Sequence, residues 1–172
     1  LCGTMSVGKT TLVNALKETE QFKDYNFATE RSKYLSNLGI PLNTDSTLKG
    51  QTVFLAERCA ELMHENIITD RTIFDVMAFT QNAKSIAYQD KDAFEEYAKE
   101  FIREYDYIFY ISPHGLPIED NGVRETDEHY RDIIDFSITT FIKRYSHRAK
   151  TIEEISGSTE ERIQQILNIT GL

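Results

Sequence analysis

Apolar residues recur every three or four positions in several stretches of the chain, which is the spacing of an amphipathic helix. In residues 10–19, for example, Leu12, Val13 and Leu16 fall on one face. The same spacing predicts helices over residues 49–65, 92–105 and 128–145, a helix that begins within 75–79, and a last helix over 158–169. The Ser-Thr-Glu-Glu sequence that opens this last helix is typical of a capping box.

Short apolar runs without helical spacing lie between the predicted helices. They predict strands at residues 27–29, 67–69, 107–111 and 151–155, and the run at 67–69 is typical of a buried parallel strand. Strands that alternate with helices favour a parallel sheet with helices on both faces, so we expect an α/β fold. Because the sequence contains no internal repeat and no linker-like segment, we interpret residues 1–172 as a single domain.

Charge and composition narrow the classes of function. The chain has 172 residues and a formal net charge of −9 at pH 7, which disfavours binding to nucleic acids or to anionic membranes by general attraction. No apolar run approaches the ~18 residues of a membrane span, and Cys2 and Cys59 have the spacing of neither a zinc site nor a disulfide framework. We therefore expect a cytoplasmic protein, in the host-cell cytoplasm if it is encoded by a phage. The residues before Gly3 are too few for a full strand, so we expect further strand residues upstream.

The clearest motif lies at residues 3–10, GTMSVGKT, which fits the pattern Gly-x4-Gly-Lys-[Ser/Thr]. A loop that wraps phosphates with backbone N–H groups needs glycine where a side chain would collide, and the helix that follows offers free N–H groups and a partial positive charge. Lys9 adds an ammonium group for the phosphate oxygens, and Thr10 a hydroxyl group for Mg²⁺. We expect ATP to be bound by this loop and the start of its helix, at Gly3, Met5, Ser6, Val7, Gly8, Lys9, Thr10 and Thr11.

Asp70 directly follows the predicted strand at 67–69, and Arg71 comes next. At the carboxyl end of a parallel strand, a carboxylate lies near the phosphate loop, where it can hold Mg²⁺ together with Thr10 or accept a proton. An arginine in the next position can clamp a phosphate group of the donor or the acceptor. The alternative is an aspartate that caps a helix, followed by a surface arginine. The sequence has no Asn-Lys-x-Asp segment, which disfavours a GTPase switch.

A segment rich in proline, glycine and charge, at residues 113–131, is typical of a lid. Its Arg124 and Arg131 are candidates to neutralise the charge that develops during phosphoryl transfer. The alternative is an ordinary surface loop. Glu30 follows the strand predicted at 27–29 and is a candidate acceptor ligand or general base, although a helix-capping role is an equal alternative.

These segments, in this order, resemble the NadR/Ttd14-type P-loop kinases (the AAA_28 domain), which include ribosylnicotinamide kinase domains and phage nucleoside and 5-hydroxymethyluracil kinases. The segments that carry the resemblance are GTMSVGKTTL at 3–12, ATERSKYL at 28–35, TDRTIFD at 69–75, DNGVRETDEHYR at 120–131 and GSTEER at 157–162. The resemblance implies an adenylate-kinase-like core of five parallel strands in the order 2-3-1-4-5. It also implies an adenine-side turn at Gly157 and Ser158, and acceptor contacts from Glu30, Lys33, Gln51 and Arg71.

The sequence thus favours an ATP- and Mg²⁺-dependent kinase in which Lys9, Asp70, Arg71, Arg124 and Arg131 act in catalysis. The expected acceptor is a small nucleoside or nucleotide. Lys33 replaces an arginine that the family often has, and a lysine lacks the bidentate grip of a guanidinium, so the acceptor stays open. The alternative functions are a nucleotide-binding regulatory ATPase or GTPase module, and a kinase for a modified base in DNA, which the charge does not favour.

Overall fold

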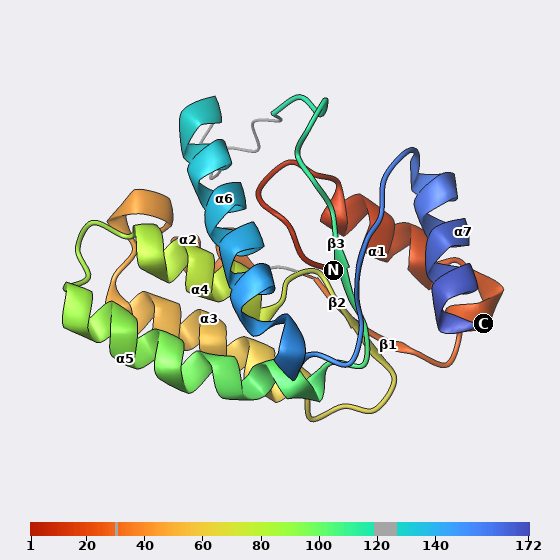
Figure 1. The fold of residues 1–172 in the computed structure, drawn as a ribbon, viewed down its shortest axis with the longest axis horizontal. Coiled ribbons are helices and arrows are strands. Elements are labelled where there is room, and N and C mark those ends of the chain that lie inside the picture. The colour runs from red at the N-terminus through yellow and green to blue at the C-terminus, as the bar shows by residue number, and fades with distance from the viewer. Residues whose placement is uncertain (30, 119–126) are drawn as a thin grey trace.

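The described part of the chain comprises residues 1–29, 31–118 and 127–172 of a computed structural model. Helices separate its successive strands, as the hydrophobic pattern predicts (Figure 1). The helices are α1 (Lys9–Lys17), α2 (Ser32–Asn37), α3 (Leu48–Glu61), α4 (Ile73–Asn82), α5 (Tyr88–Ala98), α6 (Glu128–Tyr145) and α7 (Thr159–Thr170), and the strands are β1 (Asn26–Ala28), β2 (Ile67–Thr69), β3 (Ile108–Tyr110) and β4 (Ile152–Glu154). Short 3₁₀ helices lie at Glu20–Phe22 (η1), Asn43–Asp45 (η2), Lys99–Glu104 (η3) and Ser146–Arg148 (η4).

The four strands form two parallel pairs. β1 pairs with β2, with Phe27 opposite Ile68, and β3 pairs with β4, with Phe109 opposite Glu153. Side chains in β3 are buried, whereas two of the three in β4 are exposed, which is consistent with β4 being at an edge. The parallel pairing confirms the α/β class.

The first two residues lie between these pairs. The Leu1 amino group donates a hydrogen bond to the Thr69 carbonyl oxygen (2.6 Å), and the Cys2 amide donates one to the Phe109 carbonyl oxygen (2.8 Å). Cys2 also forms an isolated parallel bridge with Tyr110. The described residues therefore contain two strand pairs and one bridge, and the order of a single five-stranded sheet stays a prediction.

Helices cover both sides of the strands (Figure 1). On one side α1 and α7 enclose a core that includes Leu12, Leu16 and Ile166, each at most 3% exposed. On the other side α3, α4, α5 and α6 form a larger core around α4. Residues 73–80 of α4 are all buried, so this helix is the centre of that layer and holds the residues at its N-terminus in place.

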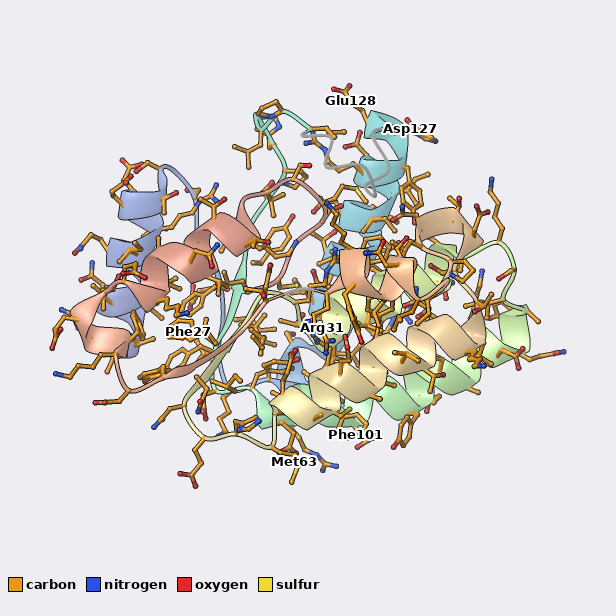
Figure 2. The ribbon with its side chains drawn as sticks, turned by 180° about the vertical axis from the view of Figure 1, so that it is seen from behind. Phe27, Arg31, Met63, Phe101, Asp127 and Glu128 are labelled. Atoms are coloured by element: carbon orange, nitrogen blue, oxygen red, sulfur yellow. The ribbon has the colours of Figure 1, made fainter. Side chains whose placement is uncertain are left out.

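Several helix boundaries differ from the prediction. The apolar spacing within residues 49–65 predicts Met63 on the inner face of a helix, but α3 ends at Glu61. Met63 is 84% exposed and lies at the edge of the molecule (Figure 2). The helix predicted over 92–105 begins earlier, at Tyr88, and changes to a 3₁₀ helix at Lys99. The helical spacing from Phe94 also predicts Tyr97 on the inner face, but Tyr97, within α5, is 63% exposed, and the helix buries Phe94 and Ala98 instead. Within the described residues, no helix is long and apolar enough to cross a bilayer.

Candidate functional site

The phosphate loop has the backbone that its motif predicts. Gly3 has φ +149°, and a Cβ atom there would lie 2.6 Å from the carbonyl oxygen of Ile111, so only glycine fits. Ser6 and Gly8 also have positive φ, 59° and 82°, after which α1 begins at Lys9. No side chain caps this helix start, which leaves its N–H groups oriented for an anion.

Lys9 is buried within the loop. Its Nζ donates hydrogen bonds to the carbonyl oxygens of Gly3 (2.5 Å) and Thr4 (2.7 Å), and lies 3.9 Å from Asp75 Oδ1. Burial lowers the pKa of Lys9, and the neighbouring Asp75 carboxylate opposes that change. The ammonium group is therefore held over the loop by neutral carbonyls, which a phosphate anion can outcompete.

Asp75 supports the loop from the first turn of α4. It is fully buried and accepts hydrogen bonds from the Gly3 amide (3.2 Å), the Thr72 amide (2.8 Å) and the Thr72 hydroxyl (2.8 Å). The bond from the Thr72 amide belongs to a capping box that begins α4. The position of Asp75, five residues after Asp70, predicts a structural residue with Arg71 as a candidate partner. The hydrogen bonds above connect Asp75 to Gly3 and Thr72.

Thr10 and Asp70 face each other across the loop. The Thr10 hydroxyl donates a hydrogen bond to Asp70 Oδ2, and Asp70 itself is 1% exposed. The Asp70 amide donates to the Ala28 carbonyl oxygen (2.9 Å), which extends the β1–β2 pairing and fixes the carboxylate at the end of β2. A hydroxyl and a carboxylate oxygen side by side fit Mg²⁺, which takes few protein ligands and completes its shell with phosphate oxygens and water. In keeping with so small a donor set, the described residues contain no group of three or more His, Cys, Asp or Glu placed to hold a metal ion.

A cavity of about 310 Å³ connects the loop with five other segments. Its walls come from the phosphate loop and the start of α1, the start of α2, the segment before α3 with the first turns of that helix, the end of β2 with α4, the start of the predicted lid, and the turn before α7 with the start of that helix. The predicted site residues that it brings together are Met5, Ser6, Val7, Gly8, Lys9, Thr10, Thr11, Gln51, Asp70, Arg71, Gly157 and Ser158. Gly3 does not line the cavity, since it lies beneath the loop against Ile111.

The acceptor-side predictions are only partly brought together. Gln51 is 3% exposed and lines the cavity, whereas Lys33 is exposed and does not. Instead Ser32, the first residue of α2, faces the cavity, and Arg31 turns toward α3, where its Nη1 lies 3.3 Å from Glu57 Oε1 (Figure 2). The acceptor contact of Lys33 therefore stays a prediction. Glu30 lies outside the described residues.

The lid arginines are placed differently from one another. Arg124, in residues 119–126, lies outside the described part of the chain. Arg131 is 8% exposed, and its Nη1 donates a hydrogen bond to the Leu116 carbonyl oxygen (2.8 Å) rather than lining the cavity. The Arg131 carbonyl oxygen in turn accepts from the Thr4 hydroxyl (3.3 Å). Arg131 thus links α6, the phosphate loop and the start of the predicted lid, and its role as a phosphate clamp stays a prediction.

Several cavity residues were not singled out from the sequence. Arg162 lines the cavity and donates from Nη1 to the Val7 carbonyl oxygen (2.8 Å). Phe54 and Phe79 form apolar walls, and the guanidinium of Arg71 lies over the Phe79 ring, 5.0 Å from its centroid. The GSTEER segment contained the signal for Arg162. The two phenylalanines occupy ordinary core positions in their helices, so nothing in the sequence marks them as residues of a site.

Comparisons with known proteins were made for the whole chain. A family model described as an AAA domain (AAA_28) matches residues 1–162. None of the curated proteins matches the chain. Among solved structures, the chain is similar to that of a deoxyadenosine kinase from M. mycoides with bound dCTP, with a TM-score of 0.67, 17% sequence identity, and coverage of 99% of this chain and 96% of the other. At this identity the similarity establishes the fold, and the reaction has to be argued from the site.

Proposed function

We propose that this chain, which belongs to the AAA_28 family of AAA domains, is a phosphotransferase that moves the γ-phosphoryl group of ATP to a nucleoside-like acceptor. One observation carries the proposal. A single cavity joins the phosphate loop and the Thr10–Asp70 pair to a second wall, where aromatic side chains of Phe54 and Phe79 lie with the buried Gln51 amide. A hydrolase that only turns over ATP has no use for such a second wall.

The donor end of the cavity suits a nucleoside triphosphate. The loop's N–H groups and the start of α1 suit its phosphates, and Lys9 can exchange the Gly3 and Thr4 carbonyls for phosphate oxygens. Thr10 and Asp70 would hold Mg²⁺, which neutralises charge on the phosphate oxygens when bound. The turn at Gly157 and Ser158 lines the same cavity and is the proposed position of the adenine.

The acceptor end suits a flat ring with a polar edge. Phe54 and Phe79 supply aromatic faces and Leu42 supplies an aliphatic one, while the Gln51 amide and the Ser46 hydroxyl are buried polar groups in the same lining. A carboxamide offers both a donor and an acceptor, the pair that a nucleobase edge requires, and aromatic walls favour stacking with the base. We therefore infer a nucleoside-like acceptor whose sugar hydroxyl is directed toward Arg71 and Asp70.

In the proposed transfer, the acceptor hydroxyl oxygen forms a bond to the γ-phosphorus while the bond to the β–γ bridging oxygen breaks. The hydroxyl proton passes to a carboxylate, either Asp70 or Glu30, and ADP leaves. Arg71, together with Arg124 and Arg131 from the lid, neutralises charge on the transferred group. For the fold, we infer five parallel strands in the order 2-3-1-4-5, in which the segment of Leu1 and Cys2 counts as strand 1 and β1 to β4 count as strands 2 to 5. The hydrogen bonds from Leu1 to Thr69 and from Cys2 to Phe109 support this central position.

A combined melting-temperature and phosphotransfer screen tests this function. Nucleosides, deoxynucleoside monophosphates, nicotinamide riboside and modified oligonucleotides are each offered with ATP and Mg²⁺; the correct acceptor raises the melting temperature and becomes phosphorylated.

Asp70→Asn is expected to abolish transfer while ATP binding survives, whereas Glu30→Gln reports on the other candidate base. Gln51→Leu is expected to raise the KM of the acceptor and leave that of ATP unchanged, with Gln81→Leu, which lies outside the cavity lining, as its control. Wild-type transfer by Asp70→Asn would remove Asp70 from the mechanism.

A further inference from the structure

We propose that Arg162 is a positioning residue for the phosphate donor, which ties the turn before α7 to the phosphate loop and holds the loop in the shape that binds polyphosphate. The inference rests on the proposed function only in taking ATP as the ligand. It assigns Arg162 no contact with the transferred group.

Arg162 connects two walls of the cavity that are far apart in the sequence. Its backbone amide donates to the Ser158 carbonyl oxygen (3.0 Å) in the first turn of α7. Its side chain reaches the phosphate loop, where Nη1 donates to the Val7 carbonyl oxygen (2.8 Å), a residue 155 positions earlier in the chain. Val7 and Ser158 both line the cavity, so one side chain couples the turn to the loop directly.

The bond to Val7 acts at the part of the loop with the least common backbone conformation. Val7 lies between Ser6 and Gly8, both of which have positive φ. The Val7 carbonyl and the Gly8 N–H belong to one planar trans peptide unit and point in opposite directions. A guanidinium that holds the carbonyl toward α7 therefore fixes the Gly8 N–H on the opposite side, as one of the loop amides that suit a phosphate.

The charge of Arg162 is not explained by folding alone. The side chain is 7% exposed, forms no ion pair with any described carboxylate, and has a buried Nε atom without a hydrogen-bond partner. Burial lowers its pKa, and no acidic side chain in the described part of the chain opposes that change. A buried cation of this kind weakens the unliganded fold, and its charge is compensated when an anion occupies the adjacent loop.

The test separates loop positioning from a simple structural role, because the two predict different results for Arg162→Met. Methionine keeps most of the packing volume and removes the charge and the donor. The binding of MgATP and of tripolyphosphate is measured by calorimetry, and the melting temperature is measured without ligand. Arg148→Met is the matched control, since Arg148 also has a buried Nε atom without a partner but pairs with Glu100 (3.1 Å) and does not line the cavity.

We expect Arg162→Met to have an unchanged or higher melting temperature and to bind both ligands about tenfold to a hundredfold more weakly, the range for losing one charge-assisted hydrogen bond. Arg148→Met is expected to bind as the wild type does. If Arg162 had only a structural role, Arg162→Met would lower the melting temperature and leave the affinity for both ligands unchanged, and that result overturns the inference. Loss of affinity for ATP with unchanged affinity for tripolyphosphate also overturns it, because the loop would then be unaffected.

Two further results separate this inference from the proposed function. If the methionine variant does not fold, Arg162→Lys decides: weaker tripolyphosphate binding supports the inference, since a single ammonium lacks the planar reach of a guanidinium, and wild-type affinity overturns it. A wild-type chain that binds ATP but phosphorylates no acceptor contradicts the proposed function while the Arg162 comparison stands. A wild-type chain that binds neither ATP nor tripolyphosphate contradicts both.

Discussion

Substituting Gly3 by alanine tests whether the phosphate loop depends on the close approach of two backbone segments. The new Cβ would lie 2.6 Å from the Ile111 carbonyl oxygen and 3.1 Å from Val7 Cγ2, at a φ of +149°. The conformational strain costs about 1–3 kcal/mol and the overpacking a further 1–3 kcal/mol, so we expect a loss of roughly 2–6 kcal/mol. The clashing atom belongs to the backbone, so the contact cannot relax by moving a side chain. The Ile111 backbone is itself held by a hydrogen bond from its amide to the Cys2 carbonyl oxygen (2.9 Å).

Gly39→Ala supplies the matched control for this prediction. Gly39 also has a positive φ, +82°, but a Cβ there would meet no atom within 4 Å, so the substitution carries strain of about 1–2 kcal/mol without a collision. The free energy of unfolding is measured for both variants by urea titration, with ATP binding measured in parallel. We expect Gly3→Ala to lose clearly more stability than Gly39→Ala and to lose ATP binding. Equal losses in the two variants would refute the packing of the loop against Ile111.

Three other predictions address the buried charges. Asp75→Ala removes the acceptor for the Gly3 and Thr72 amides, so we expect the free energy of unfolding to fall by roughly 3 kcal/mol in urea titration. Asp90→Ala, on the exposed surface, is the control, and an equal effect of both substitutions would contradict the role of Asp75 in supporting the loop. Lys9→Met is expected to weaken ATP binding at least about tenfold in calorimetry, and unchanged affinity would place the phosphates elsewhere. Burial raises the pKa of Glu61 to about 7, against the opposing effect of Arg58, so the folded state keeps a proton that the unfolded state loses near its ordinary value of 4.5. The stability that this proton gives is present at low pH and is lost as the pH rises through about 7. Glutamine does not titrate, so urea titrations should show Glu61→Gln gaining stability relative to the wild type between pH 5 and 8. A difference in the free energy of unfolding that stays constant with pH would contradict the raised pKa.

Local features of the site could be predicted from the sequence. The phosphate loop needs only its own residues and the helix that follows, so the pattern from Gly3 to Thr10 predicted a loop that requires glycine and a helix start with free N–H groups, which the structure has at Gly3, Gly8 and the start of α1. The position of Asp70 followed from the rule that strand ends meet at one edge of a parallel sheet. The alternation of strands and helices was sufficient for the α/β class.

Features that depend on distant segments could not be predicted in the same way. Nothing in the first residues indicates that Val7 is held by Arg162, or that Arg131 bonds to Leu116 instead of facing the cavity. Helical spacing places Met63 inward only while the helix continues, and Met63 lies beyond the end of α3. Tyr97 lies within α5 and is nevertheless exposed, because Phe94 and Ala98 occupy the face that this helix buries. Lys33 was assigned by resemblance alone, and the turn of α2 directs Ser32 to the cavity in its place.

The fate of the γ-phosphate decides whether the chain transfers a phosphoryl group to an acceptor or only hydrolyses ATP. Wild-type chain is incubated with γ-labelled ATP, Mg²⁺ and each candidate acceptor, and the label is followed in the acceptor and in inorganic phosphate. We expect one nucleoside-like acceptor to take up most of the label, and we expect Asp70→Asn to prevent this. Label that appears only as inorganic phosphate with every acceptor would contradict a kinase and favour a regulatory ATPase.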